Sequence, residues 1–216
     1  IMNEKIYEIY PLSFHFYQSK DFQKKQALEL LKRKILLLKK LNYIVDNKLT
    51  FKADLASKVY SFELQIGELF ENGFLESLTP KDLFIVITAL VYEPRKGEKK
   101  IKLPKNIKKI KNELDNFLNT LHKEERSFKI FPLCKRFFFH LSEVARLWFE
   151  GAKFYTLTKF SEVDEGEIVR YFRMSIQVLR EIYSSEVINY NLKSKILECI
   201  ARVNRDVIDA EKDFEV

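Results

Sequence analysis

The chain has 216 residues, 46% of them hydrophobic, and carries a formal net charge of +7 with an isoelectric point of about 9.2. This length and apolar content exclude a small chain that needs disulfides to hold a core, and a content of only five glycines favours helices over a sheet-rich fold. The basic charge is compatible with a phosphate-binding surface but does not require one.

The first predicted element is an amphipathic helix over residues 22–41, because leucine and isoleucine recur there at three- and four-residue steps between lysines. A small hairpin follows over residues 43–51, where the turn-forming pair Asp46-Asn47 separates two apolar runs. A helix followed by such a hairpin resembles the end of a winged-helix unit. We therefore predict a winged-helix-like N-terminal segment over residues 1–51.

Helical patterning resumes over residues 52–70 and ends at Asn72-Gly73, a pair that tolerates the left-handed backbone common at helix ends. The next helix is predicted over residues 80–92, because Thr79 can cap it and the proline that follows suits the first helical position. Its side chains are largely apolar. We therefore expect this helix to be buried.

A basic loop without periodicity spans residues 94–104 and separates the buried helix from one whose apolar stripe runs from 107 to 121. A further helix is predicted over residues 133–150, with Gly151 as its stop. Trp148 lies on the apolar side of that helix. We therefore expect its indole ring to pack in the core.

The last part begins with a short helical piece at Phe154, followed by a turn and a long helix over residues 165–184, an order that resembles a helix-turn-helix. The final helix carries apolar residues at helical spacing from 192 to 207, and we expect the acidic end at 211–215 to fray. Residues 52–216 are predicted to form a helical domain. The whole chain is predicted to be an all-α, multi-helix bundle.

No catalytic machinery can be identified, since the chain lacks a Gly-rich phosphate loop, a DExH tetrad and a nucleophile with a partner base. The three histidines lack the spacing that would place two imidazoles on one helix face, and Cys134 and Cys199 match no metal-ligand spacing. We therefore predict no catalytic residues, no metal site and no cofactor in this chain. The cysteines are expected to be buried thiols in a reducing cytosol.

The sequence also gives an expectation for localisation. No apolar run approaches the length of a membrane span, and residues 1–9 carry charges where a signal peptide needs an apolar stretch. We therefore expect a soluble, cytoplasmic protein without a membrane partner.

The clearest candidate for a binding surface lies in the predicted long helix. Arg170 and Arg173 are one turn apart, and Arg180 extends the same cationic ridge. Apolar residues at positions 168, 172, 176 and 179 occupy the opposite side, which we expect to be buried. The arginines could hold phosphates and stack on unpaired bases, or they could form ion pairs with glutamates of the same helix. Spacing leaves both open.

Two motifs in this region resemble the signature of a known family. Residues 148–154 contain Trp-x-x-Gly-x-x-Phe, and residues 165–170 contain Glu-Gly-x-Ile-x-Arg at the family's separation. Together they resemble the C-terminal (DSHCT) domain of superkiller and exosome-associated DExH-box RNA helicases. Residues 72–74, 78–80 and 205–208 resemble further segments of that domain.

The resemblance implies a domain that packs against a helicase core, with one long helix, residues 165–184, facing the RNA channel as a ratchet. Arg170 and Arg173 would then contact single-stranded RNA. Glu68 on a neighbouring helix would orient an arginine or meet a base, and Asp164, Glu165 and Gly166 would cap and start the long helix. ATP and Mg²⁺ are expected in the helicase core, outside these residues.

The main hypothesis is therefore an RNA-binding C-terminal domain of an ATP-dependent helicase, with single-stranded RNA and the helicase core as partners. One alternative is a protein-interaction scaffold without RNA contact. It gains weight because Lys52-Ala53-Asp54 stands where the family usually has Lys-Gly-Arg, which removes a positive charge and a flexible position. A second alternative is a DNA regulator that uses the predicted helix-turn-helix. It ranks last, because that helix is apolar along much of its length.

Overall fold

The computed structural model describes residues 9–13, 21–95, 97–98 and 102–209, and the acidic end predicted to fray lies outside these ranges. Helices dominate the described residues, so the all-α, multi-helix prediction is confirmed. In chain order the elements are η1 (Tyr10–Leu12), α3 (Asp21–Lys40), β1 (Ile44–Val45), β2 (Lys48–Leu49), α4 (Phe51–Lys58), α5 (Glu63–Glu71), α6 (Phe74–Ser77), α7 (Pro80–Val91), α8 (Lys105–Ser127), η2 (Phe139–Leu141), α9 (Ser142–Phe149), α10 (Phe154–Leu157), η3 (Thr158–Phe160), α11 (Glu165–Tyr183), α12 (Tyr190–Val203) and η4 (Asp206–Ile208).

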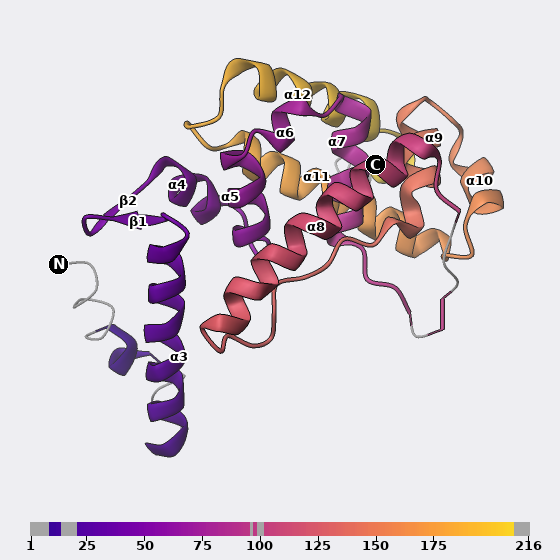
Figure 1. Cartoon of the computed structure of the whole chain (residues 1–216). Helices are drawn as coiled ribbons and strands as arrows, with labels where there is room; N and C mark the ends of the chain where they lie inside the picture. Colours follow the sequence, from indigo (N-terminus) through magenta and orange to yellow (C-terminus); the bar gives the residue numbers. More distant parts are fainter. Residues whose placement is uncertain (1–8, 14–20, 96, 99–101, 210–216) are drawn as a thin grey trace.

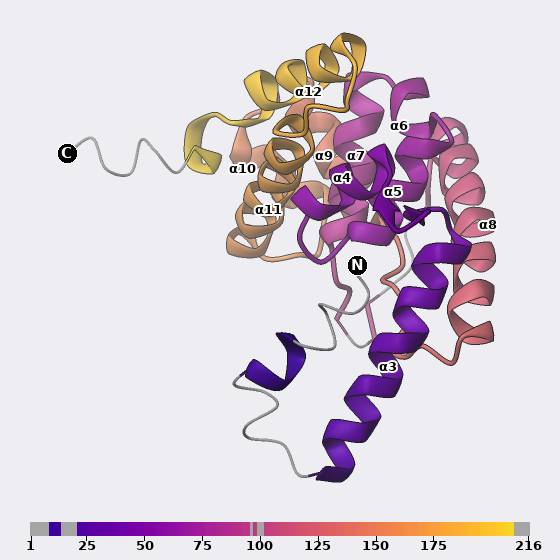
Figure 2. The same cartoon turned by 90° about the vertical axis from the view of Figure 1, so that its left-hand side faces the viewer.

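The N-terminal helix α3 projects from one end of a body formed by the later helices (Figures 1 and 2). The hairpin that follows is antiparallel, with Ile44 opposite Leu49. Between its strands Asp46 and Asn47 have φ angles of 49° and 59°, the left-handed conformation that a two-residue hairpin turn requires. The predicted helix and hairpin are both confirmed.

A small apolar cluster joins this hairpin to α4. Tyr43 and Ile44 bury their side chains against Ala53 and Ala56, apart from the main core. Gly67 of α5 allows Tyr43 to lie this close, because a Cβ atom at position 67 would collide with the tyrosine hydroxyl. The division of the chain into segments 1–51 and 52–216 stays a prediction.

Helix α7 runs through the centre of the body. It begins as predicted, because the Thr79 hydroxyl accepts a hydrogen bond from the backbone N–H of Asp82 at 3.1 Å. Every residue from Leu83 to Val91 is buried, and α9, α11 and α12 all pack on this helix (Figure 1). The prediction that it is buried is therefore confirmed. Among the described residues no helix is both long and apolar enough to cross a membrane.

Trp148 of α9 lies fully buried at the junction of three segments. Its indole N–H donates to the Val203 carbonyl at 2.9 Å, and the Phe154 ring meets it edge-on at 5.9 Å. The Arg205 guanidinium lies 3.5 Å from the centre of the indole ring and donates to the carbonyls of Trp148 and Ala152. The predicted core position of Trp148 is confirmed, and the ring ties α9 to the end of α12.

The single helix predicted over residues 52–70 is wrong, because the structure divides it into α4 and α5. Ser61 in the connecting turn has a φ of 71°. The neighbouring Tyr60 is exposed, and its backbone N–H donates to the Glu181 carboxylate at 3.1 Å. No glycine or proline marks this break, so apolar periodicity could not reveal it.

The start of the helix predicted over residues 133–150 is wrong, since α9 begins only at Ser142. An irregular segment precedes η2, and there the Phe138 N–H donates to the Ala89 carbonyl of α7 at 2.7 Å. The phenylalanines on either side, Phe137 and Phe139, are buried in the main core, and η2 packs on α7. The final helix likewise ends early, at Val203, and a separate turn, η4, follows.

We predict that Trp148→Ala lowers the free energy of unfolding by roughly 3–5 kcal/mol, because it empties an aromatic core site. Trp148→Phe should cost less, since it keeps a ring but loses the hydrogen bond to Val203. Urea unfolding followed by circular dichroism measures both. Tyr155→Ala is the matched control, because that ring is 63% exposed. Equal stability of the Trp148→Ala and Tyr155→Ala variants would contradict the assignment.

Candidate nucleic-acid interface

Helix α11, the predicted ratchet, packs one side on the core and turns the other outward. It begins at Glu165, as predicted. Its apolar residues at the predicted positions are all buried: Ile168, Phe172, Ile176 and Leu179. The residues on the outward face of α11 are therefore the ones that can contact a ligand.

The start of α11 is stabilised differently from the prediction. Asp164 was expected to cap the helix, but its side chain makes no capping hydrogen bond. Instead its carboxylate accepts from Arg95 at 2.8 Å, and Glu167 lies 2.9 Å from the same guanidinium. Capping by the Asp164 side chain is therefore wrong, because a distant arginine holds that carboxylate.

Arg170 occupies the outward face of α11. Its side chain is 56% exposed, lies over the Tyr171 ring at 4.3 Å and is 3.7 Å from the Glu167 carboxylate. An exposed ion pair of this length stabilises a fold very little, so the guanidinium can exchange its partner for a ligand. Lys135 and, more weakly, Arg170 lower the pKa of the Glu93 carboxyl.

Arg173 lies one turn further along, but its surroundings are different. It is half-buried, and its Nε donates to the Ile208 carbonyl at 3.0 Å. A second guanidinium nitrogen donates to the Val207 carbonyl at 2.9 Å. The expectation that both arginines stand on one exposed ridge is therefore wrong for Arg173, which holds η4 against α11.

A groove of about 350 Å³ runs beside α11 and separates it from the turn between α4 and α5. α4 and α11 lie side by side in Figure 2 and are in contact. The residues that line the groove include Tyr60, Phe62, Lys135, Met174, Gln177 and Glu181. Met174 and Gln177 are four and seven residues beyond Arg170, so the three share one face of the helix.

The groove combines an apolar surface with mixed charge. Tyr60 is 80% exposed, and Met174 is also exposed. Lys135 pairs with Glu93 at 2.8 Å, while the Glu181 carboxylate accepts from Gln177 at 3.1 Å and from the Tyr60 N–H. Because carboxylates repel phosphates, this interior suits flat, uncharged groups such as bases better than a sugar-phosphate backbone.

Glu68 lies on α5 and has a partner of its own. Its carboxylate is 2.9 Å from the Lys52 ammonium, which is 6% exposed at the side chain and lies over the Tyr43 ring at 4.6 Å. Glu68 therefore neutralises a buried lysine, and the structure gives it no arginine of α11 as a partner among the described residues. Lys52, Ala53 and Asp54 lie in the first turn of α4, and the side chain of Lys52 is buried there.

Sequence reasoning missed Tyr60 and Lys135. Tyr60 lies within the helix predicted over residues 52–70. Lys135 lies within the helix predicted over residues 133–150, at a position where the structure has an irregular segment. No sequence signal marks either as a groove residue, because the groove exists only where the α4–α5 turn meets α11.

The structure also groups His122 with Glu125 and Cys134, although the spacing of the histidines predicted no metal site.

Comparison with known proteins places the chain in a family. Residues 46–211 match the family model described as the DSHCT (NUC185) domain. The chain is 24% identical over 204 residues to the ATP-dependent RNA helicase mtr4 of Schizosaccharomyces pombe, a match that covers 88% of this chain and 18% of that protein. It is 26% identical over 195 residues to the DExH-box ATP-dependent RNA helicase DExH9 of Arabidopsis thaliana, covering 83% of this chain and 19% of that protein.

A third relative is the antiviral helicase SKI2 of Saccharomyces cerevisiae, 24% identical over 229 residues that cover 97% of this chain and 17% of that protein. The chain thus spans less than a fifth of the length of these curated relatives. The family model, by contrast, covers most of the chain, and the motifs at residues 148–154 and 165–170 lie within the match. This protein belongs to the DSHCT (NUC185) domain family, whose members include parts of DExH-box RNA helicases.

Proposed function

We propose that this chain is the RNA-contacting helical domain of an ATP-dependent DExH-box RNA helicase. In this proposal α11 and the groove beside it hold single-stranded RNA as it leaves the helicase core. ATP and Mg²⁺ bind to that core, outside these residues. The names of the relatives support the helicase setting, and the geometry around Arg170 supports the contact with RNA.

The observation that carries the proposal is the exposed Arg170, on the same face of α11 as Met174 and Gln177, which line the groove with Tyr60. A guanidinium can bind a phosphate or stack on a base, and aromatic surfaces accept any base face. The carboxylates inside the groove keep phosphates at its rim. The contact is therefore expected to tolerate different sequences.

Arg173 and Glu68 have supporting roles in this proposal. Arg173 is engaged by the carbonyls of Val207 and Ile208, and Glu68 by Lys52. Both act by fixing the elements that frame the groove, since η4 rests on α11 and Glu68 anchors α4 to α5. We assign direct contact to Arg170 and positioning to the other two.

A protein-interaction scaffold is the second candidate, and the mixed charge of the groove favours it. The inward-facing Lys52 also removes a cation from the surface. The DNA-regulator alternative has less support, because α10, the first helix of the supposed helix-turn-helix, has only four residues. RNA binding that does not depend on Arg170 would favour the scaffold.

We predict that Arg170→Ala weakens single-stranded RNA binding about 5- to 10-fold, which corresponds to about 1 kcal/mol for one exposed charged contact. Its melting temperature should stay close to that of the wild type, because exposed arginines stabilise folds little. Fluorescence anisotropy with a labelled RNA, at two salt concentrations, measures the affinity. Arg202→Ala is the matched control, since Arg202 is a similarly exposed, ion-paired arginine on α12. Equal losses in both variants would refute a specific role for Arg170.

Arg173→Ala should behave in the opposite way. Loss of its hydrogen bonds to two backbone carbonyls is expected to cost about 1–3 kcal/mol of stability and to free η4 from α11. RNA affinity, measured well below the melting temperature, should fall less than for Arg170→Ala. A variant that keeps its melting temperature but loses RNA binding would show direct contact by Arg173.

Glu68→Ala tests the buried pair. It should lower the free energy of unfolding by roughly 2–3 kcal/mol, because Lys52 is left buried without its counter-charge. The double variant Lys52→Met/Glu68→Leu should recover part of that loss, since no charge then remains buried. Urea unfolding measures both. Loss of RNA affinity at unchanged stability would instead make Glu68 a contact residue.

A further inference from the structure

Three side chains with metal-binding atoms converge at the end of α8. His122 and Glu125 lie one turn apart on this helix, and Cys134 lies in the segment that follows it. One ligand atom of each residue lies within 4.8 Å of the other two. His122 and Glu125 are each only 2% exposed, so this is an interior cluster and not a surface patch.

The hydrogen bonding of His122 leaves one of its ring nitrogens available. Nε2 lies 2.7 Å from the Cys134 carbonyl oxygen. Because a carbonyl can only accept, Nε2 must carry the proton, and Nδ1 keeps its lone pair. Nδ1 is buried and has no hydrogen-bond partner among the described residues. An imidazole fixed in this way, with one nitrogen on a backbone carbonyl, is the usual arrangement of a metal-binding histidine.

Glu125 supplies the negative charge. Both of its carboxylate oxygens lie 3.0 Å from the same donor, the backbone N–H of Cys134. No lysine or arginine forms an ion pair with Glu125 among the described residues. The Cys134 thiol also hydrogen-bonds to this carboxylate, whose two oxygens still keep lone pairs for a metal ion.

We propose that His122, Glu125 and Cys134 form a binding site for a divalent transition-metal ion, with Zn²⁺ as the best fit. Imidazole nitrogen, carboxylate oxygen and thiolate sulfur are the three ligand types that Zn²⁺ takes in proteins. In a tetrahedral zinc site, bonds of 2.0–2.3 Å place ligand atoms about 3.3–3.8 Å apart, so the three side chains would have to move closer together to hold the ion. The fourth position would be held by water.

The charges balance when the ion binds. Binding breaks the S–H bond, releases the proton to solvent and forms the S–Zn bond. One thiolate and one carboxylate then neutralise the two positive charges of the ion.

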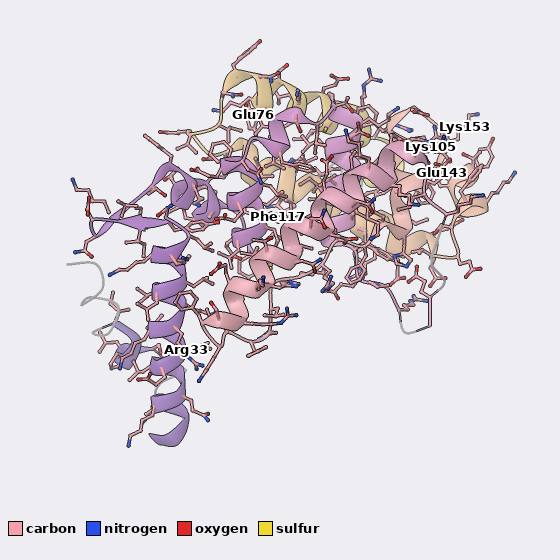
Figure 3. The ribbon with its side chains drawn as sticks, viewed as in Figure 1. Arg33, Glu76, Lys105, Phe117, Glu143 and Lys153 are labelled. Carbon is pink, nitrogen blue, oxygen red and sulfur yellow. The ribbon has the colours of Figure 1, made fainter. Side chains whose placement is uncertain are left out.

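A bound metal ion would join α8 to the segment that follows it, next to the groove. Cys134 directly precedes Lys135, whose carbonyl accepts from Gln65 of α5 at 3.1 Å. In Figure 3 Arg33 of α3 lies beside the end of α8, where it donates to the Lys129 carbonyl at 2.8 Å. Metal binding would therefore fix the segment that connects α8, α3 and the groove. This inference does not depend on RNA binding.

Titration of the full 216-residue chain, freed of metal by a chelator, with Co²⁺ alone tests the proposal. We expect one Co²⁺ per chain, the intense visible absorption of a four-coordinate site and a thiolate-to-cobalt charge-transfer band in the near ultraviolet. Zn²⁺ should abolish both signals by displacement and should raise the melting temperature. A wild-type chain without a charge-transfer band overturns the proposal, whatever the variants do.

Variants then assign the ligands. Cys134→Ser should remove the charge-transfer band, and His122→Gln and Glu125→Gln should each weaken Co²⁺ binding by at least about 100-fold. Cys199→Ser and His140→Gln are matched controls, because Cys199 is a buried thiol elsewhere and His140 also has a buried, unpartnered Nδ1. Circular dichroism verifies that each variant is folded. A band that survives Cys134→Ser, or that disappears in Cys199→Ser, would overturn the assignment.

Discussion

The complete burial of α7 is the constraint on which the other elements depend. A helix whose residues from Leu83 to Val91 are all buried must be covered on every side, and α9, α11, α12 and the phenylalanines before α9 supply that cover. A buried polar contact also joins α11 to α7, where the hydroxyls of Thr88 and Ser175 lie 3.2 Å apart. The face that α11 turns outward, with Arg170, follows from how it packs on α7.

The family motifs mostly describe packing. Trp148 and Phe154 form one ring contact, Ile168 is buried in the core, and Arg205 from the closing segment covers the indole. Such residues identify the fold because each needs the others to remain buried. The groove, in contrast, is lined by Tyr60 and other residues outside these motifs, so a shared signature does not by itself specify what the surface binds.

Several buried polar groups lie on α4, α5 and α8 or next to these helices. Burial and the nearby Glu68 carboxylate raise the pKa of Tyr43, whose hydroxyl donates to the Leu64 carbonyl at 3.3 Å. The Lys52–Glu68 pair and the His122 cluster extend this region to α8. Groups of this kind are costly to bury unless their partners are fixed, so they specify how α4, α5 and the segment after α8 meet.

The sequence alone determined the helical class, the hairpin turn at Asp46, the capped start of α7 and the burial of Trp148, because each depends on local spacing or on a residue's own backbone preference. The family motifs could also be recognised from it. Only the tertiary structure decided the break between α4 and α5 and the different surroundings of Arg170 and Arg173. A broken helix and a continuous one have the same apolar period, and the carbonyls that engage Arg173 lie 34 and 35 residues away in the chain. Packing of the folded chain brings such distant residues together, and the local sequence pattern does not determine that packing.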